Sequence, residues 1–105
     1  MADVVEQLLE RQVPALKDLV DRRIMTQEEV KALVDQRRSY EYRLQRRAAR
    51  KIDYLRYSEY ELKVTKLCKL RKKRLGLTKS GIWDHAQTQH LFFIFERVNF
   101  GIPAP

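Results

Sequence analysis

The sequence predicts an all-α protein built from antiparallel helical hairpins. Apolar side chains recur at the three- and four-residue steps of a helix through most of the 105 residues. The chain has only 3 glycines and 3 prolines, too few for the frequent turns of an all-β sandwich or barrel. Charged residues make up 34% and apolar residues 44%, so the chain is highly charged yet apolar enough to form a core.

The first expected helix spans residues 3–21. Asp3 is its expected N-cap, since a short carboxylate there accepts a hydrogen bond from a free amide of the first turn. Pro14 should kink or split this helix, because proline lacks an N–H donor and its ring clashes with the preceding turn. The apolar face comprises Val4, Val5, Leu8, Leu9, Leu16, Leu19 and Val20.

A second helix should begin at Thr26 and end at about Arg47. Thr26 and Glu29 have the spacing of a capping box, in which each side chain binds an amide of the first turn. The apolar positions of this helix are Val30, Leu33, Val34, Tyr40 and Leu44.

The third expected helix is the longest, and it ends where Gly76 can adopt the left-handed conformation typical of a helix C-terminus. Its predicted face comprises Tyr57, Tyr60, Val64, Leu67, Arg71 and Leu75, with Ile52, Tyr54 and Leu55 at its start. Cys68 lies mid-helix, where it is expected to be a small core residue.

Ser80 is the predicted cap of a fourth helix, whose inner face comprises Trp83, Ala86, His90, Phe93 and Arg97. The second half of this helix is apolar almost all round, through Leu91–Phe95, so we expect neighbours on both sides. The tail, residues 99–105, should be irregular because it contains Gly101, Pro103 and Pro105.

We therefore expect three segments: an N-terminal hairpin over 1–47 kinked at Pro14, a helix pair over 48–98, and the irregular tail over 99–105. A terminal helical repeat normally presents a polar outer face, whereas the last helix here presents phenylalanines. The chain is thus expected to be the first slice of a longer helical array, ending in the tail of a fragment.

Charge is concentrated in the middle of the chain. Residues 37–79 have a net charge of +12, whereas residues 1–36 have −3 and residues 80–105 have −1. A block this basic can attract a phosphate backbone or an acidic partner, although a solvated helix face is the more common role of such a run.

Catalytic and metal chemistry find no support in the residue pattern. His85 and His90 are five residues apart, which points them in different directions on one helix. No phosphate-binding loop, metalloprotease motif or paired-carboxylate arrangement is present. The single cysteine excludes an internal disulfide and suits a reducing compartment, and no apolar run approaches the length of a membrane span. We expect no enzyme activity and no cofactor.

Two groups of residues carry a resemblance to known proteins. Tyr54, Tyr57, Tyr60 and Glu61, followed by Phe95-Glu96-Arg97-Val98, resemble the two helices of a HAT repeat (half-a-TPR), a helical hairpin of RNA-processing scaffolds. A tyrosine stands where that repeat usually has a tryptophan, and Val98 stands where alanine is typical.

The longer match includes Met25–Leu33, the stretch Tyr40-Glu41-Tyr42-Arg43-Leu44-Gln45-Arg46-Arg47, Asp53–Glu61 and Arg71–Gly76. These segments resemble the N-terminus of the U-three small nucleolar RNA-associated protein six family, over residues 1 to about 98. Segment 78–90 matches least.

This resemblance implies a HAT-repeat scaffold subunit of the UtpB complex, without catalytic activity, in the small-subunit processome of the nucleolus. That particle assembles on pre-ribosomal RNA and supports the processing that releases the small-subunit rRNA. The implied partner is the WD-repeat subunit numbered eighteen, together with the other UtpB subunits and the small nucleolar RNP.

Two binding hypotheses follow. In the first, the helices dock a protein segment through aromatic or arginine anchors, for which the candidates are Arg46, Arg47, Tyr57 and Arg71. In the second, a ridge on the third helix binds RNA phosphates without reading bases, through Lys63, Lys66, Lys69 and Lys73. A third hypothesis, a basic amphipathic helix that binds a membrane surface, has the least support. Such a helix exposes its apolar face, whereas the fold should bury that face here. The uncovered last helix also predicts self-association of the isolated chain.

Overall fold

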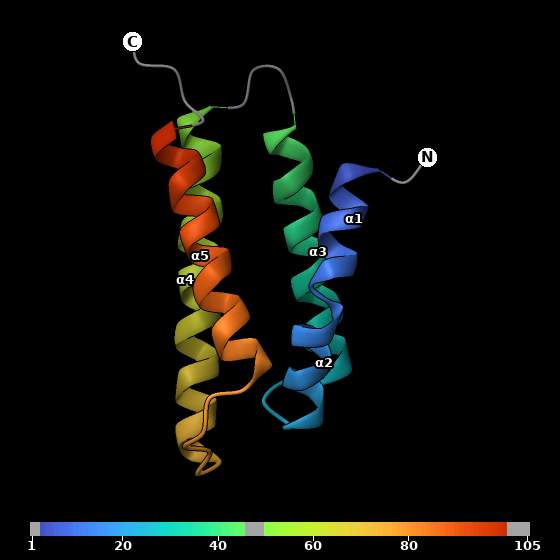
Figure 1. Ribbon diagram of the computed structural model, residues 1–105, viewed down its shortest axis with the longest axis vertical. Helices are drawn as coiled ribbons and strands as arrows, with labels where there is room; N and C mark the ends of the chain where they lie inside the picture. Colours follow the sequence, from blue (N-terminus) through green and yellow to red (C-terminus); the bar gives the residue numbers. More distant parts are fainter. Residues whose placement is uncertain (1–2, 46–49, 101–105) are drawn as a thin grey trace.

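The computed structural model describes residues 3–45 and 50–100, with side chains through Arg97. All regular structure in this part of the chain is helical, which confirms the predicted all-α class (Figure 1). None of these helices is long and apolar enough to cross a membrane. The helices are α1 (Val4–Arg11), α2 (Val13–Asp21), α3 (Gln27–Leu44), α4 (Lys51–Arg74) and α5 (Ile82–Phe100).

The first expected helix is split, which decides between the kink and the break left open by the sequence. α1 ends at Arg11, and α2 begins at Val13 after the single residue Gln12, with Pro14 in its first turn. A proline is tolerated there because the N–H it lacks would have no intrahelical partner. Asp3 caps α1 as predicted, since its Oδ1 accepts a hydrogen bond from Val5 N–H at 2.9 Å.

The predicted capping box of α3 is confirmed. Glu29 N–H donates to Thr26 Oγ1 at 3.2 Å, and Thr26 N–H donates to Glu29 Oε1 at 3.1 Å. The helix continues to Leu44, and the residues expected to end it, Arg46 and Arg47, lie outside the described part.

Gly76 ends α4 as predicted, at φ +72°, in the left-handed region. The predicted cap of the last helix, Ser80, is wrong. α5 begins at Ile82, and the first-turn amide of Trp83 donates to Asp18 Oδ2 of α2 at 3.0 Å in place of the serine hydroxyl. This helix also continues to Phe100, two residues into the expected tail, because no glycine or proline precedes Gly101 there.

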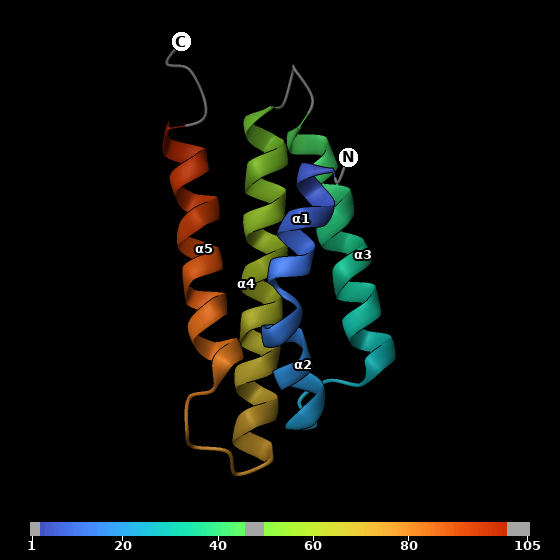
Figure 2. The same cartoon turned by 45° about the vertical axis from the view of Figure 1, so that its right-hand side comes forward.

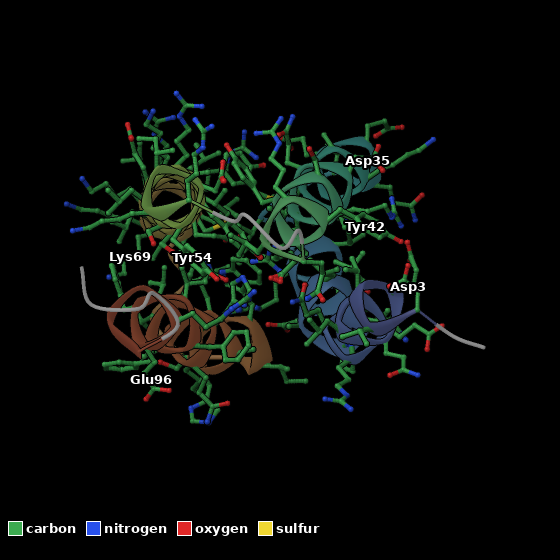
Figure 3. The ribbon with its side chains drawn as sticks, turned by 90° about the horizontal axis from the view of Figure 1, so that it is seen from above. Asp3, Asp35, Tyr42, Tyr54, Lys69 and Glu96 are labelled. Atoms are coloured by element: carbon green, nitrogen blue, oxygen red, sulfur yellow. The ribbon has the colours of Figure 1, made fainter. Side chains whose placement is uncertain are left out.

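The helices form four antiparallel rods, the first of which is α1 followed by α2 (Figures 1 and 2). Viewed end-on, the rods occupy the corners of a square (Figure 3). Each rod packs on the next in the chain, and α2 packs on α5, which closes the ring. The described residues therefore form a four-rod bundle, and the start of an open solenoid is not visible within them.

The apolar core has two clusters. The larger joins α2, the loop after it, α3, α4 and the start of α5, and its buried members are Ala15, Leu16, Leu19, Ile24, Met25, Leu33, Val64, Cys68 and Trp83. The smaller lies toward the other end of the bundle and comprises Leu44, Tyr54, Tyr57 and Ile94. Cys68 is buried, as expected of a small core residue.

The inner faces of α4 and α5 are rotated from those predicted. Leu67 of α4, Leu75 directly after α4, and Phe93 of α5 were expected inside, yet they are 38%, 50% and 43% exposed. Glu61 and Gln87 are buried instead, because each has hydrogen-bond partners on neighbouring helices. The apolar pattern alone missed this, since it treats polar residues as surface.

An ion cluster fastens the loop between α4 and α5 to α2. The guanidinium of Arg22 binds Asp18 at 2.8 Å and Asp84 at 3.0 Å, and Lys72 binds Asp84 at 2.8 Å. Trp83 N–H also donates to Asp18 Oδ2, at 3.0 Å. These contacts hold the first turn of α5 against α2.

Candidate functional site

A buried polar layer separates the two core clusters. The Arg37 guanidinium binds both oxygens of the Glu61 carboxylate, at 2.6 and 3.0 Å. The same guanidinium donates to Gln12 at 2.9 Å and to Gln87 at 2.8 Å, so all four rods meet at this arginine. Arg37 is 2% exposed and Glu61 is 0% exposed. We interpret this layer as structural, because the ion pair at its centre is almost fully shielded from solvent and joins all four rods.

The electrostatics of Glu61 follow from this pairing. Burial by itself raises the pKa of a carboxyl, but the neighbouring Arg37 guanidinium and the His90 imidazole outweigh burial and lower the pKa of Glu61 to about 2. Glu61 is therefore ionised across the ordinary pH range, inside the bundle.

Tyr57 was predicted to anchor a partner, and the structure contradicts this. Its side chain is 0% exposed, with its ring stacked on Tyr40 at a centroid distance of 5.1 Å and its hydroxyl 3.1 Å from His90 Nε2. Burial and the nearby carboxylates of Glu41 and Glu61 raise the pKa of Tyr57. Tyr57 is a core residue because its hydroxyl finds a polar partner inside the bundle.

Arg97, which follows Glu96 near the end of α5, forms its ion pair with a residue of another helix. Arg97 binds both oxygens of Glu41 on α3, at 2.6 and 3.1 Å. The Arg97 guanidinium also lies over the rings of Phe93 and Tyr54, at 5.0 and 5.8 Å from their centroids. This second pair ties α5 to α3.

The four lysines of the predicted RNA ridge are all exposed on α4. Lys63 has an ion pair with Glu59 at 3.4 Å. In the part of the chain that the structure describes, Lys66, Lys69 and Lys73 have no carboxylate partner. Lys69 lies on the outer side of α4, near α5 (Figure 3). Lys72, which interrupts the ridge, is mostly buried in the ion cluster.

A hollow along the outer side of α4 and α5, here called the α4–α5 groove, lies beside this ridge. It has a volume of about 690 Å³, and Cys68 and Trp83 form part of its floor. Phe92 and Phe95 line it and are 64% and 39% exposed. The remaining lining residues are Thr65, Lys69, Lys72, Ser80, Asp84, His85, Gln87, Thr88 and Leu91. The sequence indicated these phenylalanines, but not their position beside lysines of α4.

A second hollow, here called the arginine hollow, is lined by residues where α2 ends, α3 begins and α4 ends. Figure 2 shows these three helix ends at the same end of the bundle. Its volume is about 560 Å³. Its lining residues are Val20, Arg23, Ile24, Met25, Thr26, Glu29, Arg71, Arg74 and Leu75.

Arg71, a predicted partner anchor, lies in the wall of the arginine hollow. It binds Glu29 at 2.7 Å and donates to the carbonyl oxygen of Ile24 at 3.1 Å. The Arg71 guanidinium, with the amide of Thr26, lowers the pKa of Glu29 to about 2. Of the four predicted anchors, the structure therefore places Tyr57 in the core and Arg71 at a surface hollow; the other two lie outside the described residues.

No group of three or more histidine, cysteine, aspartate or glutamate side chains suited to a metal ion occurs in the described part of the chain. Cys68 is a buried thiol, and burial raises its pKa to about 11, so it is poorly suited to act as a nucleophile at neutral pH. The lysine ridge, the α4–α5 groove and the arginine hollow are instead surfaces suited to binding other macromolecules.

The comparison with known families identifies the chain. A family model described as U3 small nucleolar RNA-associated protein 6 matches residues 9–92. The chain belongs to this family. Its match covers α2, α3 and α4 in full, most of the length of α5 and the last residues of α1.

Curated relatives agree with this assignment. The U3 small nucleolar RNA-associated protein 6 of Schizosaccharomyces pombe is 36% identical over 98 residues, which are 92% of this chain and 20% of that protein. The homologue of Homo sapiens is 30% identical over 76 residues, 72% of this chain and 13% of that protein. The chain thus spans a fifth or less of the length of these relatives.

Proposed function

We propose that this chain is a non-catalytic docking module of a subunit that acts in pre-ribosomal RNA processing in the nucleolus. Membership of a family named for its association with U3 small nucleolar RNA supports this role. The finer assignment is a HAT-repeat subunit of the UtpB complex within the small-subunit processome, required for processing of the small-subunit rRNA. Within the UtpB complex, the four-rod bundle would bind the WD-repeat subunit numbered eighteen.

The α4–α5 groove carries the docking proposal. Phe92 and Phe95 leave a large part of their rings in water beside a hollow floored by Trp83 and Cys68. Burying a fully exposed ring contributes about 1.5–3 kcal/mol, and covering the exposed part of Phe92 or Phe95 contributes the corresponding fraction of that. Aromatic anchors surrounded by polar residues are typical of the centres of protein interfaces.

The test compares two kinds of charged substitution on the 105-residue chain. Phe92→Glu and Phe95→Glu together should weaken capture of the purified WD-repeat subunit by about tenfold or more. Val13→Glu is the matched control, because Val13 is an exposed apolar residue, 54% accessible, on α2. Capture by the wild-type chain should persist at three times physiological salt. Equal weakening in the two variants would contradict the docking proposal.

A second candidate function is sequence-nonspecific binding of pre-ribosomal or small nucleolar RNA. The observation that favours it is the exposure of Lys63, Lys66, Lys69 and Lys73 along α4. Removing one lysine from a bound phosphate should lower the slope of log affinity against log salt by about 1. Lys66→Glu with Lys73→Glu should flatten this slope, and Lys17→Glu with Lys31→Glu, two exposed lysines on α2 and α3, should not. If the slope were unchanged in the Lys66→Glu, Lys73→Glu variant, the lysine ridge would be excluded as the RNA-binding surface.

A further inference from the structure

We propose that the arginine hollow binds a short acidic and aliphatic segment of another protein. The site is separate from the α4–α5 groove, with which it shares no lining residue, so the proposal does not depend on the docking role of that groove.

The floor of the hollow is apolar. Ile24 and Met25 are 1% and 6% exposed and belong to the larger core cluster, and Val20 lies beside them. Leu75, which follows α4, lines the edge of the hollow and is half exposed. A volume of about 560 Å³ is within the range of about 300–1,000 Å³ found for ligand sites. The hollow therefore has room for aliphatic side chains and the surfaces to cover them.

The rim is positively charged. Three arginines, Arg23, Arg71 and Arg74, line the hollow with one carboxylate, that of Glu29. Arg71 already binds Glu29 and the Ile24 carbonyl, so it stiffens the wall. Arg23 and Arg74 lie at the surface and have no carboxylate partner in the described residues. Two guanidinium groups thus remain available for acidic groups of a ligand.

The backbone at Arg23 gives a second, independent observation. Arg23 has φ +60°, the left-handed conformation that terminates α2. Arg23 N–H donates to Val20 O at 3.0 Å, and Ile24 N–H donates to Leu19 O at 2.9 Å, the pair of bonds of a Schellman motif. Glycine is the usual residue at this position because it has no side-chain penalty there. An arginine at a position suited to glycine places a cation at the rim at some conformational cost, which supports a role for its side chain.

An apolar floor together with a positively charged rim favours a peptide over a nucleic acid as the ligand. A phosphate backbone would leave the apolar floor unused, whereas an acidic and aliphatic peptide matches both the rim and the floor. The peptide is expected to place leucine or isoleucine side chains on Ile24 and Met25, with aspartate or glutamate beside Arg23 and Arg74.

The probe is a short fluorescein-labelled peptide with two central leucines flanked by aspartates and glutamates. We expect saturable binding by fluorescence anisotropy. The same peptide with both leucines replaced by serine, and a second one with its acids replaced by amides, should bind weakly. Oligouridine should not compete.

Arg23→Gly and Arg74→Glu together should lower peptide affinity by about tenfold. Arg56→Glu is the matched control for Arg74→Glu, because Arg56 is also an exposed arginine on α4, away from the hollow. Arg23→Gly alone should weaken binding without lowering the melting temperature, since glycine suits the conformation at this position. This separates removal of the cation from unfolding of the chain.

Three results would overturn the proposal: no saturable binding of the acidic peptide, equal binding of the serine peptide, or an equal drop in affinity in Arg56→Glu. Displacement of the peptide by oligouridine would also overturn it, because the hollow would then bind polyanions in general.

Discussion

Arg37→Met is expected to destabilise the bundle far more than the same change at the next residue along the chain. Methionine keeps an unbranched apolar side chain but removes the guanidinium, and so leaves the Glu61 carboxylate buried without its main partner. Removing one member of a buried ion pair typically costs about 3–5 kcal/mol. The matched control is Arg38→Met.

The pKa of Glu61 gives a stabilisation of the same sign and order. Its value of about 2 in the folded protein lies below the ordinary value of 4.5. At about 1.4 kcal/mol for each pKa unit, this difference corresponds to roughly 3 kcal/mol of stability at neutral pH. A cost of this order is a large part of the roughly 5–15 kcal/mol that is usual for a domain.

The sign of the pH dependence follows from the direction of the shift. Because folding lowers the pKa of Glu61, its ionised form stabilises the fold above about pH 4.5, and this contribution is lost as the pH falls toward 2. Arg37→Met lacks this contribution at every pH. The difference in unfolding free energy between wild type and variant should therefore narrow on acidification.

Arg38 provides the comparison because it also binds a carboxylate, that of Glu6, at 2.7 Å. Its side chain is 38% exposed and that of Glu6 is 41% exposed, so water competes for both groups. Arg38→Met should cost about 0–1 kcal/mol.

The assay is urea unfolding followed by circular dichroism, from pH 7 down to pH 3. If Arg37→Met unfolds the chain outright, the double variant Arg37→Met with Glu61→Met should recover a folded protein, because no buried charge is then left unpaired. The reasoning would be refuted if Arg37→Met and Arg38→Met lowered stability equally, or if the cost of Arg37→Met did not change with pH.

Three further predictions concern local geometry. Gly76→Ala should cost about 1 kcal/mol in thermal unfolding, through the left-handed φ alone, since an added Cβ would meet nothing within 4 Å. Gly81→Ala should cost more, about 1–3 kcal/mol, because its Cβ would lie 2.7 Å from Arg22 Cζ and 2.8 Å from Asp18 Oδ2 and disturb the ion cluster. Cys68 should resist thiol reagents at pH 8 in the folded chain and react in urea, since it is 2% exposed with a pKa raised to about 11 by burial; rapid labelling without denaturant would contradict its place in the core.

The buried polar layer was only partly predictable. Glu61 stood out in the sequence as the carboxylate that closes the tyrosine series of α4, but its burial did not. Arg37 and Glu41 lie on the same helical row as Leu33 and Leu44, which is the signal that could have placed them inside. Each depends on a partner on another helix, Glu61 for Arg37 and Arg97 for Glu41, and no local pattern records such a pairing.

The candidate surfaces were predicted to a similar extent. The lysine ridge and the apolar end of α5 are properties of single helices, so the sequence indicated both. The arginine hollow is built by two segments that are far apart in the chain, residues 20–29 and residues 71–75. The hollow forms only because the end of α4 lies against the turn between α2 and α3. The spacing of apolar residues within one helix does not predict such a contact between helices.

The sequence by itself determined the helices and most of their ends, because caps and glycine ends depend on bonds within one turn, while it left open whether Pro14 kinks or breaks the first helix. It also carried the family resemblance. The tertiary structure decided which side of each helix faces inward, that α2 closes the ring against α5, and that Tyr57 is a core residue while Phe92 and Phe95 remain in water. These outcomes depend on packing between distant segments, where a paired charge can displace a leucine from the interior.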